Sequence, residues 1–279
     1  MKNFIKSELI FEVASKIKNQ KGFFKTYKKF KYNIEQVDIG ILNDEVSKKI
    51  EREKGNYICL NFDDLLYFDI KAKEYLCKKL KSAIGLLLKK NNLKVKKLLV
   101  IGLGNEKYAC DSLGGKVVKK ILVTKPYLDK KLFSPQEISE IYALSTGVYG
   151  TTGLDSSSVI KSICAHLKPD LVIAIDSMVS GDETRLAKSI QLSDTKLMPG
   201  GGVGNSRKEI SKDTIGVPVF AIGVPLVVDI ANICKQSQNL IVSPKDVENK
   251  VNVTSKIIAK AINLSFNNLT ETELLELTE

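Results

Sequence analysis

Three short apolar segments constrain the fold of this chain more than any other feature. They run from Lys97 to Gly102, from Asp170 to Ile175 and from Val217 to Gly223, and helical patterns flank each of them. Both alternating faces of these segments are apolar, which is typical of strands in the middle of a parallel, helix-covered sheet. The sequence therefore predicts an α/β fold in which a mainly parallel sheet lies between two layers of helices.

The helices are predicted from the spacing of apolar residues. Between Ala72 and Leu87 such residues recur every three or four positions with lysines between them, as in an amphipathic helix that covers a sheet. The same reasoning places further helices over residues 112–122, 155–167, 225–235 and 244–266. Ser243, Pro244 and Asp246 supply the last helix with an N-cap, a first-turn proline and an early acid.

The two ends of the chain differ from this central pattern. Strand-like stretches between residues 32 and 62, separated by a charged segment that suits a short helix, predict an N-terminal β appendage. The acidic tail, residues 267–279, is expected to fray. At 279 residues and 43% hydrophobic content, the chain is close to the upper size of one core, so we expect a single domain over residues 1–279.

Composition narrows the classes of protein to which the chain can belong. The longest apolar stretch, Val217 to Val228, contains two prolines and is shorter than the roughly 20 residues of a membrane span. The N-terminus has acids within its apolar part and no small-residue cleavage pattern, so it does not resemble a secretory signal. Five scattered cysteines without a C-x-x-C pair argue against disulfides and structural zinc. We expect a cytoplasmic protein with reduced thiols and no membrane partner.

The net charge of +11 is less informative than its size suggests. Nearly all of it comes from lysines that are spread along the chain without interleaved aromatic residues, so we interpret it as a solvated surface and expect no direct nucleic-acid partner. Only three arginines occur, at positions 52, 185 and 207. Each is as consistent with an ordinary ion pair as with a site that needs the bidentate geometry of arginine.

Two aspartates are the best catalytic candidates. In an open α/β sheet, ligands bind at the carboxyl ends of the strands. Asp111 follows the first apolar strand and its turn, and Asp176 stands at the end of the second. Two neighbouring acids can share one proton, so that one activates water while the other polarises a peptide carbonyl. Spacing alone favours a simpler role for Asp111, which is the N-cap of the helix that follows it.

A glycine-rich loop from Met198 to Lys208 is the third candidate feature. Backbone amides in such a loop can hold a phosphate or an oxyanion, although the glycines can equally serve tight turns. The loop contains neither a Walker motif nor G-x-G-x-x-G, so we expect no nucleotide cofactor. The single histidine, His166, lies near a helix C-terminus, and a zinc site built on imidazoles cannot be assembled. We therefore expect no metal site and no cofactor.

Five motifs together resemble the germination proteases of spore-forming bacteria. In order they read LLVIGLGN, CDSLGGKVV, PDLVIAIDSM, QLSDTKLMPGGGVGNSRKEIS and TIGVPVFAIGVPLVVD. The resemblance implies a fold akin to hydrogenase maturation proteases, synthesis as a zymogen and assembly into a homotetramer. It also implies an endopeptidase of the spore core that begins the degradation of small acid-soluble DNA-binding spore proteins during germination.

The resemblance also implies roles for individual residues. Asp111 and Asp176 match the two essential aspartates of the family, so a carboxylate dyad is favoured, and a metal-dependent mechanism stays open. Two departures stand within CDSLGG, where Cys110 and Gly115 replace prolines of the family. Candidate substrate-binding residues, expected to line the same crevice, are Asn105, Arg185, Gly201, Gly202, Gly204, Asn205 and Arg207.

The N-terminus resembles the junction of the family's pro-region. Ser7-Glu-Leu-Ile matches that junction, and Phe11 to Ser15 resembles the acid, apolar and small pattern of the substrates. We therefore predict that residues 1–12 include a removable inhibitory peptide, cut after Glu8 or after Glu12.

Two alternatives belong to other functional classes. The stretch LLVIGLGNEKYA is similar to peptidyl-tRNA hydrolases, but no histidine follows the turn at Asn105 as that family requires. The other alternative is a non-catalytic relative that binds spore proteins or nucleic acid.

Overall fold

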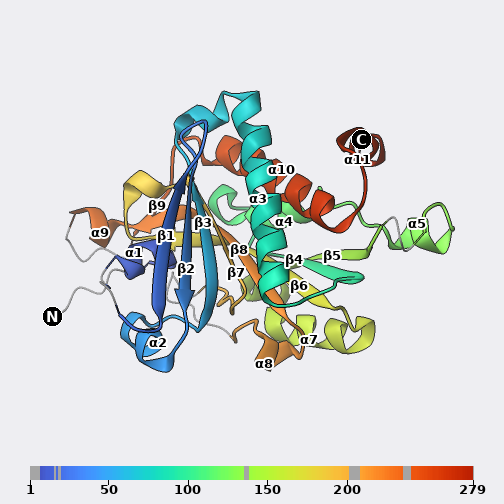
Figure 1. Cartoon of the computed structure of the whole chain (residues 1–279), viewed down its shortest axis with the longest axis horizontal. Helices are drawn as coiled ribbons and strands as arrows, with labels where there is room; N and C mark the ends of the chain where they lie inside the picture. The colour runs from blue at the N-terminus through green and yellow to red at the C-terminus, as the bar shows by residue number, and fades with distance from the viewer. Residues whose placement is uncertain are drawn as a thin grey trace.

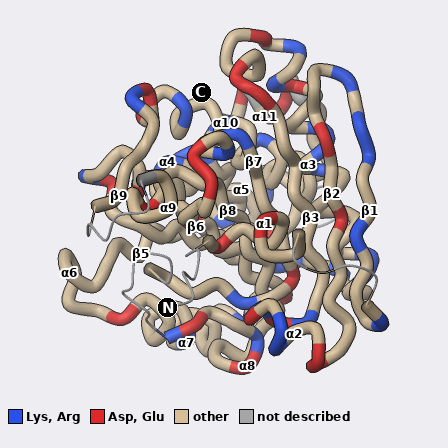
Figure 2. Tube along the Cα trace, turned by 90° about the vertical axis from the view of Figure 1, so that its left-hand side faces the viewer, with Lys and Arg blue, Asp and Glu red and all other residues tan. Residues whose placement is uncertain are grey.

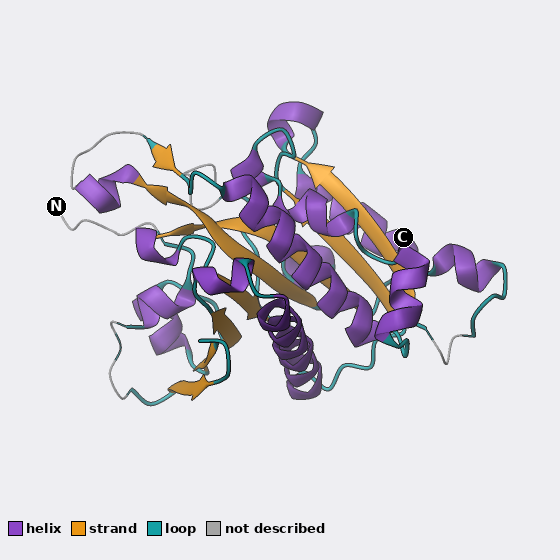
Figure 3. Ribbon diagram, turned by 90° about the horizontal axis from the view of Figure 1, so that it is seen from above, coloured by secondary structure: helices purple, strands orange, loops and turns teal. Residues whose placement is uncertain are grey.

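A single sheet of nine strands organises the molecule. The computed structural model describes residues 7–15, 17, 20–134, 138–200, 208–234 and 240–278. Eight strands follow the order β1-β2-β3-β7-β8-β6-β4-β5, and the short β9 (Ile241–Val242) pairs with β8. Helices cover both faces of this sheet (Figures 1 and 3).

Four parallel strands form the core of the sheet. They are β5 (Glu140–Gly147), β4 (Lys97–Leu103), β6 (Leu171–Ser180) and β8 (Val219–Asp229). The three predicted apolar strands are therefore β4, β6 and β8, and the predicted α/β class is confirmed. Alternation along each strand divides the core, because Leu98 and Val100 face one layer of helices while Leu99 and Ile101 face the other.

The N-terminal strands continue the same sheet. β1 (Phe23–Lys29), β2 (Glu35–Ile41) and β3 (Gly55–Asn61) pair antiparallel, and β3 joins the core through β7 (Ser189–Ser193). The predicted β appendage is therefore an extension of the central sheet, and it begins at Phe23, nine residues before the predicted start.

Three helices cover one face of the sheet and four cover the other. The first layer contains α3 (Ile70–Lys90), α4 (Leu113–Val118) and α10 (Val247–Phe266). On the opposite face, α7 (Ser156–Leu167) and α8 (Lys212–Ile215) cover the parallel strands, while α1 (Ile10–Ala14) and α2 (Asp44–Ile50) cover β2 and β3. The peripheral helices are α5 (Lys125–Asp129), α6 (Tyr149–Thr152), α9 (Ile230–Cys234) and α11 (Glu271–Thr278), with 3-10 turns η1 (Asp64–Tyr67), η2 (Ala109–Asp111) and η3 (Glu183–Arg185).

The structure corrects two helix predictions. The helix predicted over residues 225–235 is wrong for its first half, because β8 continues to Asp229 and only α9 is helical. A continuously apolar run does not distinguish strand from helix, and Pro225 is accommodated where the register of β6 and β8 shifts. The last helix begins at Val247 with Asp246 at its N-cap position, so Ser243 does not cap it.

The acidic tail and the outer surface complete the fold. Residues 271–278, expected to fray, form α11 with Leu274 buried against the main core. Among the described residues, no helix combines the length and apolar character that a bilayer span requires. Along the Cα trace, lysine and arginine are spread over many elements and interspersed with acidic residues (Figure 2).

Candidate active site

Asp111 is held in a turn that folds back on the end of β4. Gly104 has a φ of +99°, and a Cβ there would lie 2.1 Å from the carbonyl oxygen of Asp111, so only glycine fits. The Oδ2 of Asp111 accepts a 2.8 Å hydrogen bond from the N–H of Asn105. Ser112, not Asp111, occupies the N-cap position of α4, and no side chain caps that helix. The capping interpretation of Asp111 is therefore wrong.

Two glycines bring α4 against the strand ends beside Asp111. A Cβ on Gly114 would lie 2.3 Å from the carbonyl oxygen of Leu103 and 2.7 Å from that of Ile175. A Cβ on Gly102 would lie 2.3 Å from the carbonyl oxygen of Gly114. This close approach of backbones places the turn that carries Asp111 against β4 and β6.

Asp176 lies inside β6 rather than at its tip. The pairing of β4 with β6 ends at Gly102 and Ile175, and Asp176 is the first residue beyond it. β6 then continues along β8 to Ser180, with Asp176 opposite Gly223. The side chain is 8% exposed, and its Oδ1 accepts a 2.9 Å hydrogen bond from the N–H of Ser177.

The surroundings of both acids favour the protonated form. Burial raises the pKa of Asp176 well above its ordinary value, and the negative charges of Asp111 and Glu8 raise it further, while the N–H of Ser177 acts in the opposite direction. Burial also raises the pKa of Asp111, against the hydrogen bond from Asn105. Asp111 thus ionises before Asp176, and its charge helps to keep Asp176 protonated. This is the division of roles that a general base and a general acid require.

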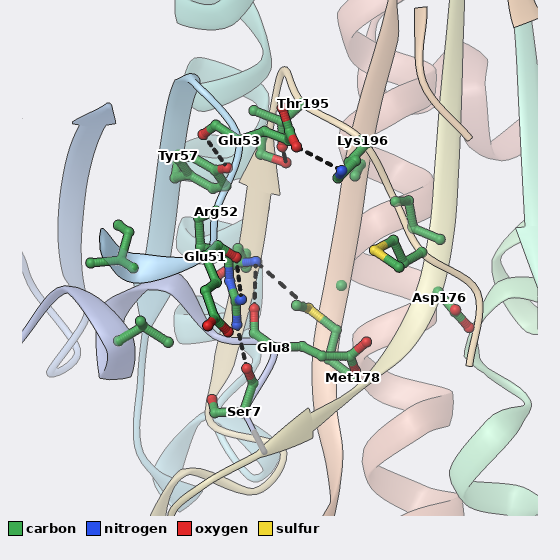
Figure 4. A pocket seen from close by; sticks show the side chains of 18 of the residues that line it. Ser7, Glu8, Glu51, Arg52, Glu53, Tyr57, Asp176, Met178, Thr195 and Lys196 are labelled. Atoms are coloured by element: carbon green, nitrogen blue, oxygen red, sulfur yellow. Dashed lines mark hydrogen bonds and ion pairs between the residues drawn. The ribbon is translucent and has the colours of Figure 1, made fainter. Parts of the chain in front are cut away.

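A pocket of about 630 Å³ opens beside Asp176. It extends from β6 and β8 toward β3 and the end of α2, and Figure 4 shows its wall. Its lining combines residues of β3, β6 and β7 with residues of the connecting segments: Glu8, Arg52, Tyr57, Asp176, Met178, Gln191, Lys196 and Met198. The volume is in the range that holds an organic ligand or a short stretch of peptide.

The N-terminal segment, residues 7–15, lies along this pocket, and its residues 7–9 are extended ahead of α1. Glu8 donates its N–H to the carbonyl of Val179 at 2.8 Å, and its carboxylate accepts the N–H of Val179 at 2.7 Å. The guanidinium of Arg52 donates to the carbonyl of Ser7. The end of β6 therefore binds both the backbone and the side chain of Glu8, and in Figure 4 Met178 lies between Glu8 and Asp176.

A second acid anchors the segment further along β6. The carboxylate of Glu12 accepts hydrogen bonds from the Oγ of Ser180 at 2.6 Å and the N–H of Gly181 at 2.7 Å. Arg185, predicted to bind substrate, stacks 4.3 Å from the ring centre of Phe11 and lies 3.9 Å from the carboxylate of Glu12. Arg185 also lies 3.7 Å from the carboxylate of Asp182, so it bridges α1 and the turn after β6.

The other predicted binding residues divide into two groups. Asn105 uses its N–H for Asp111 and its Oδ1 to accept the N–H of Lys107, so it shapes the turn that carries Asp111. Met198, at the start of the glycine-rich loop, lines the pocket. The remaining candidates, Gly201, Gly202, Gly204, Asn205 and Arg207, lie outside the described residues.

Sequence reasoning missed residues that contact the N-terminal segment. Gln191 and the backbone of Val179 both bind Glu8, and neither was a candidate. A signal for Gln191 exists in the alternation Ser189-Ile-Gln-Leu-Ser193, where a polar side chain stands among buried positions. Within the part of the chain that the structure describes, no three histidine, cysteine or acidic side chains gather as metal ligands.

Comparisons with known proteins agree with the motifs. The model of the germination protease family matches residues 7–238. The chain is 32% identical to the germination protease of Clostridium tetani, over 86% of this chain and 87% of that protein. It is 37% identical to that of Bacillus subtilis and 40% identical to that of Oceanobacillus iheyensis, over 82% and 69% of this chain. These matches span 62% and 53% of the relatives, so the chain covers less than two thirds of their length.

A solved structure also matches. It is a NiFe hydrogenase maturation protease from Thermococcus kodakarensis, with a TM-score of 0.35 and 18% identity, over 60% of this chain and 93% of that one. The family match over residues 7–238, together with the identity to relatives over most of the chain, shows that this chain belongs to the germination protease family.

Proposed function

We propose that this chain is an endopeptidase in which Asp111 and Asp176 activate water against a peptide bond. The observation that carries this proposal is the buried Asp176 in the wall of a pocket that Ser7 and Glu8 also line, with the half-buried Asp111 near enough for its charge to raise the pKa of Asp176. Ionised Asp111 takes a proton from water, and protonated Asp176 polarises the carbonyl and later protonates the departing amine. The catalytic type is thus a carboxylate dyad.

The substrates that we propose are the small acid-soluble proteins of the spore. Membership of the family supports this substrate class, a homotetramer and a location in the spore core. The pocket supports a protein substrate, because the end of β6, beyond its pairing with β4, offers the N–H and the carbonyl of Val179 to an extended chain. Recognition through main-chain hydrogen bonds of this kind is how sheet edges bind peptides.

The N-terminal segment acts, in this proposal, as an inhibitory peptide that the protease removes. Ser7 and Glu8 form part of the pocket wall near Asp176, and there they narrow the space in which a substrate would have to bind. Of the two predicted cleavage sites, the bond after Glu8 is the better candidate. Glu8 lines the pocket and influences the pKa of Asp176, whereas the carboxylate of Glu12 is bound by Ser180 and Gly181.

Asn variants of the two acids test the proposal. Asn is nearly isosteric with Asp and cannot act as a base, so Asp111→Asn and Asp176→Asn should each slow cleavage by ~10²–10⁴-fold. The measurements are the appearance of a new N-terminus at Leu9 by mass spectrometry after mild acidification, and the cleavage of a purified spore protein.

Asp155→Asn is the matched control. Asp155 caps α7 by accepting the N–H of Ser158, and Asn caps equally well, so this variant should cleave at the wild-type rate. Full activity in Asp176→Asn would remove that residue from the mechanism. Tight binding of spore proteins without any cleavage by the wild type would instead identify a non-catalytic relative.

A further inference from the structure

The side-chain amide of Gln191 contacts the N-terminal segment on both sides of a single residue, Leu9. Its Nε2 lies 3.4 Å from the carbonyl oxygen of Glu8, and its Oε1 accepts a 2.8 Å hydrogen bond from the N–H of Ile10. That carbonyl belongs to the bond between Glu8 and Leu9. We propose that Gln191 holds the scissile carbonyl of a bound peptide and stabilises the negative charge that forms on its oxygen during cleavage.

This inference rests on the proposed endopeptidase function and adds a residue to its site. The orientation of the amide follows from its two partners, because an N–H can only donate and a carbonyl can only accept. The oxygen of Gln191 must therefore face Ile10, and the nitrogen must face Glu8. The side chain is 7% exposed, so a reversed amide would lose both hydrogen bonds with little water to replace them.

The sheet itself places Gln191 opposite the dyad. Gln191 on β7 pairs with Gly223 on β8, and Gly223 pairs with Asp176 on β6. Side chains at paired positions point to the same face, and adjacent strands lie ~4.8 Å apart. Gln191 and Asp176 therefore stand on one face of the sheet, about 10 Å apart at their backbones, with a glycine between them.

Neighbouring side chains fix the amide in this place. The Sδ of Met178 lies 3.9 Å from the Nε2 of Gln191, and the Sγ of Cys59 lies 3.8 Å from its Oε1. The side chain of Met178 also covers Gly223, since a Cβ there would lie 2.0 Å from its sulfur. An amide packed in this way needs no reorganisation when charge develops beside it, which is the condition for electrostatic stabilisation of a transition state.

The length of the contact with Glu8 suits such a role. At 3.4 Å it exceeds the usual 2.7–3.2 Å of an N–H···O hydrogen bond. An interaction that is weak with the planar carbonyl and strong with the tetrahedral oxyanion lowers the barrier to reaction, whereas one that is equally strong with both does not. The short hydrogen bond to Ile10 positions the amide. The long contact with the carbonyl oxygen of Glu8 can strengthen when negative charge forms on that oxygen.

The chemical step is an ordinary hydrolysis. Water adds to the carbonyl carbon of Glu8 and gives one proton to Asp111, while the carbonyl electron pair moves to the oxygen that faces Gln191. The bond between Glu8 and Leu9 then breaks as the carbonyl reforms, and Asp176 protonates the departing nitrogen. One water is consumed, the products are a carboxylic acid at Glu8 and an amine at Leu9, and transfer of the proton from Asp111 to Asp176 restores both acids.

Gln191→Met tests the inference, because it keeps the length of the side chain and removes the N–H. We expect kcat per folded molecule to fall by ~10²–10³-fold for cleavage of a spore protein, as when one oxyanion donor is removed. KM should change much less. Gln36→Met is the matched control, since Gln36 is a glutamine of equal burial on β2 whose amide donates to Asp38. It should lose stability and keep the wild-type kcat.

A second measurement tests the contact between Gln191 and the carbonyl of Glu8 without depending on catalysis. In the full chain carrying Asp176→Asn, the ¹³C resonance of the Glu8 carbonyl should move to lower frequency when Gln191→Met is added. An unchanged resonance, or a wild-type kcat in Gln191→Met, would overturn the role of Gln191 while leaving the protease intact. A wild-type chain that cleaves no protein would overturn the proposed function and this inference together.

Discussion

The burial of Asp176 has a measurable effect on stability. A carboxyl whose pKa is raised by folding stabilises the native state only when protonated, so this stability is present below about pH 4 and is lost as pH rises through the folded pKa. Asp176→Asn does not titrate and keeps an oxygen for the N–H of Ser177. We expect the variant to be more stable than the wild type at pH 7 by ~0.5–2 kcal/mol, in the manner of substitutions that relieve a strained active site.

Calorimetry at two pH values checks this prediction. The gain in Tm should be clear at pH 7 and should largely vanish at about pH 3, where the wild-type carboxyl is mostly protonated in both states. An equal offset at both pH values would mean that the substitution acts through packing and that the pKa of Asp176 is ordinary.

Some residues of the candidate site could be identified from the sequence, and others only from the structure. The position of Asp111 and Asp176 after apolar strands, and the likeness to a family, identified them as candidates. Gln191 could not be identified in this way, because its role depends on β7 entering the sheet between β3 and β8. A glutamine in an alternating segment does not by itself indicate a binding role, because that role depends on the peptide that contacts it in the fold.

At the scale of elements, the contact of α4 with the strand ends determines where Asp111 lies. Gly114→Ala places a methyl group 2.3 Å from backbone atoms of Leu103, which cannot yield as a flexible side chain can. We expect a loss of about 1–3 kcal/mol in the free energy of unfolding, as in other overpacked sites, and a lower kcat because the turn that carries Asp111 is displaced. Urea denaturation and the cleavage assay measure the two effects.

Gly85→Ala provides the control for this variant. Gly85 lies in α3, and a Cβ there has no atom within 4 Å. Alanine should therefore stabilise the protein by ~0.5–1 kcal/mol through its helix propensity and leave cleavage unchanged. Equal behaviour of the two variants would contradict the close packing of α4 on β4.

Elements were predictable where their pattern has one interpretation. The periodicity of α3 and the double-sided apolar strands β4 and β6 each fit a single structure. The second half of β8 did not, because the run from Val224 to Val228 suits a buried helix as well as a strand, and its strand form depends on pairing with β6. β1 was missed because its exposed, lysine-rich face hides the alternation of an edge strand.

For the whole molecule, the continuity of the sheet predicts a single unfolding unit. Ile58 and Leu60 of β3 share one apolar core with Leu98 of β4 and Ile173 of β6. Hydrogen exchange followed by mass spectrometry should therefore give the same free energy of opening for β2 and β6, within ~1 kcal/mol, because both open only with the whole protein. Exchange of β2 at several kcal/mol below β6 would show that residues 23–61 form a separate domain.

The antiparallel contact of β7 with β3 has a consequence for the order of events on the ribosome. Glu8 to Ser15 are made first, and Gln191, which binds them, is added roughly 10–35 s later at ~5–20 residues per second. β3 and α1 can take their final places only when that late strand arrives. The pocket therefore forms when the N-terminal segment has already been made. A newly made chain passes through no stage in which the pocket is complete without that segment.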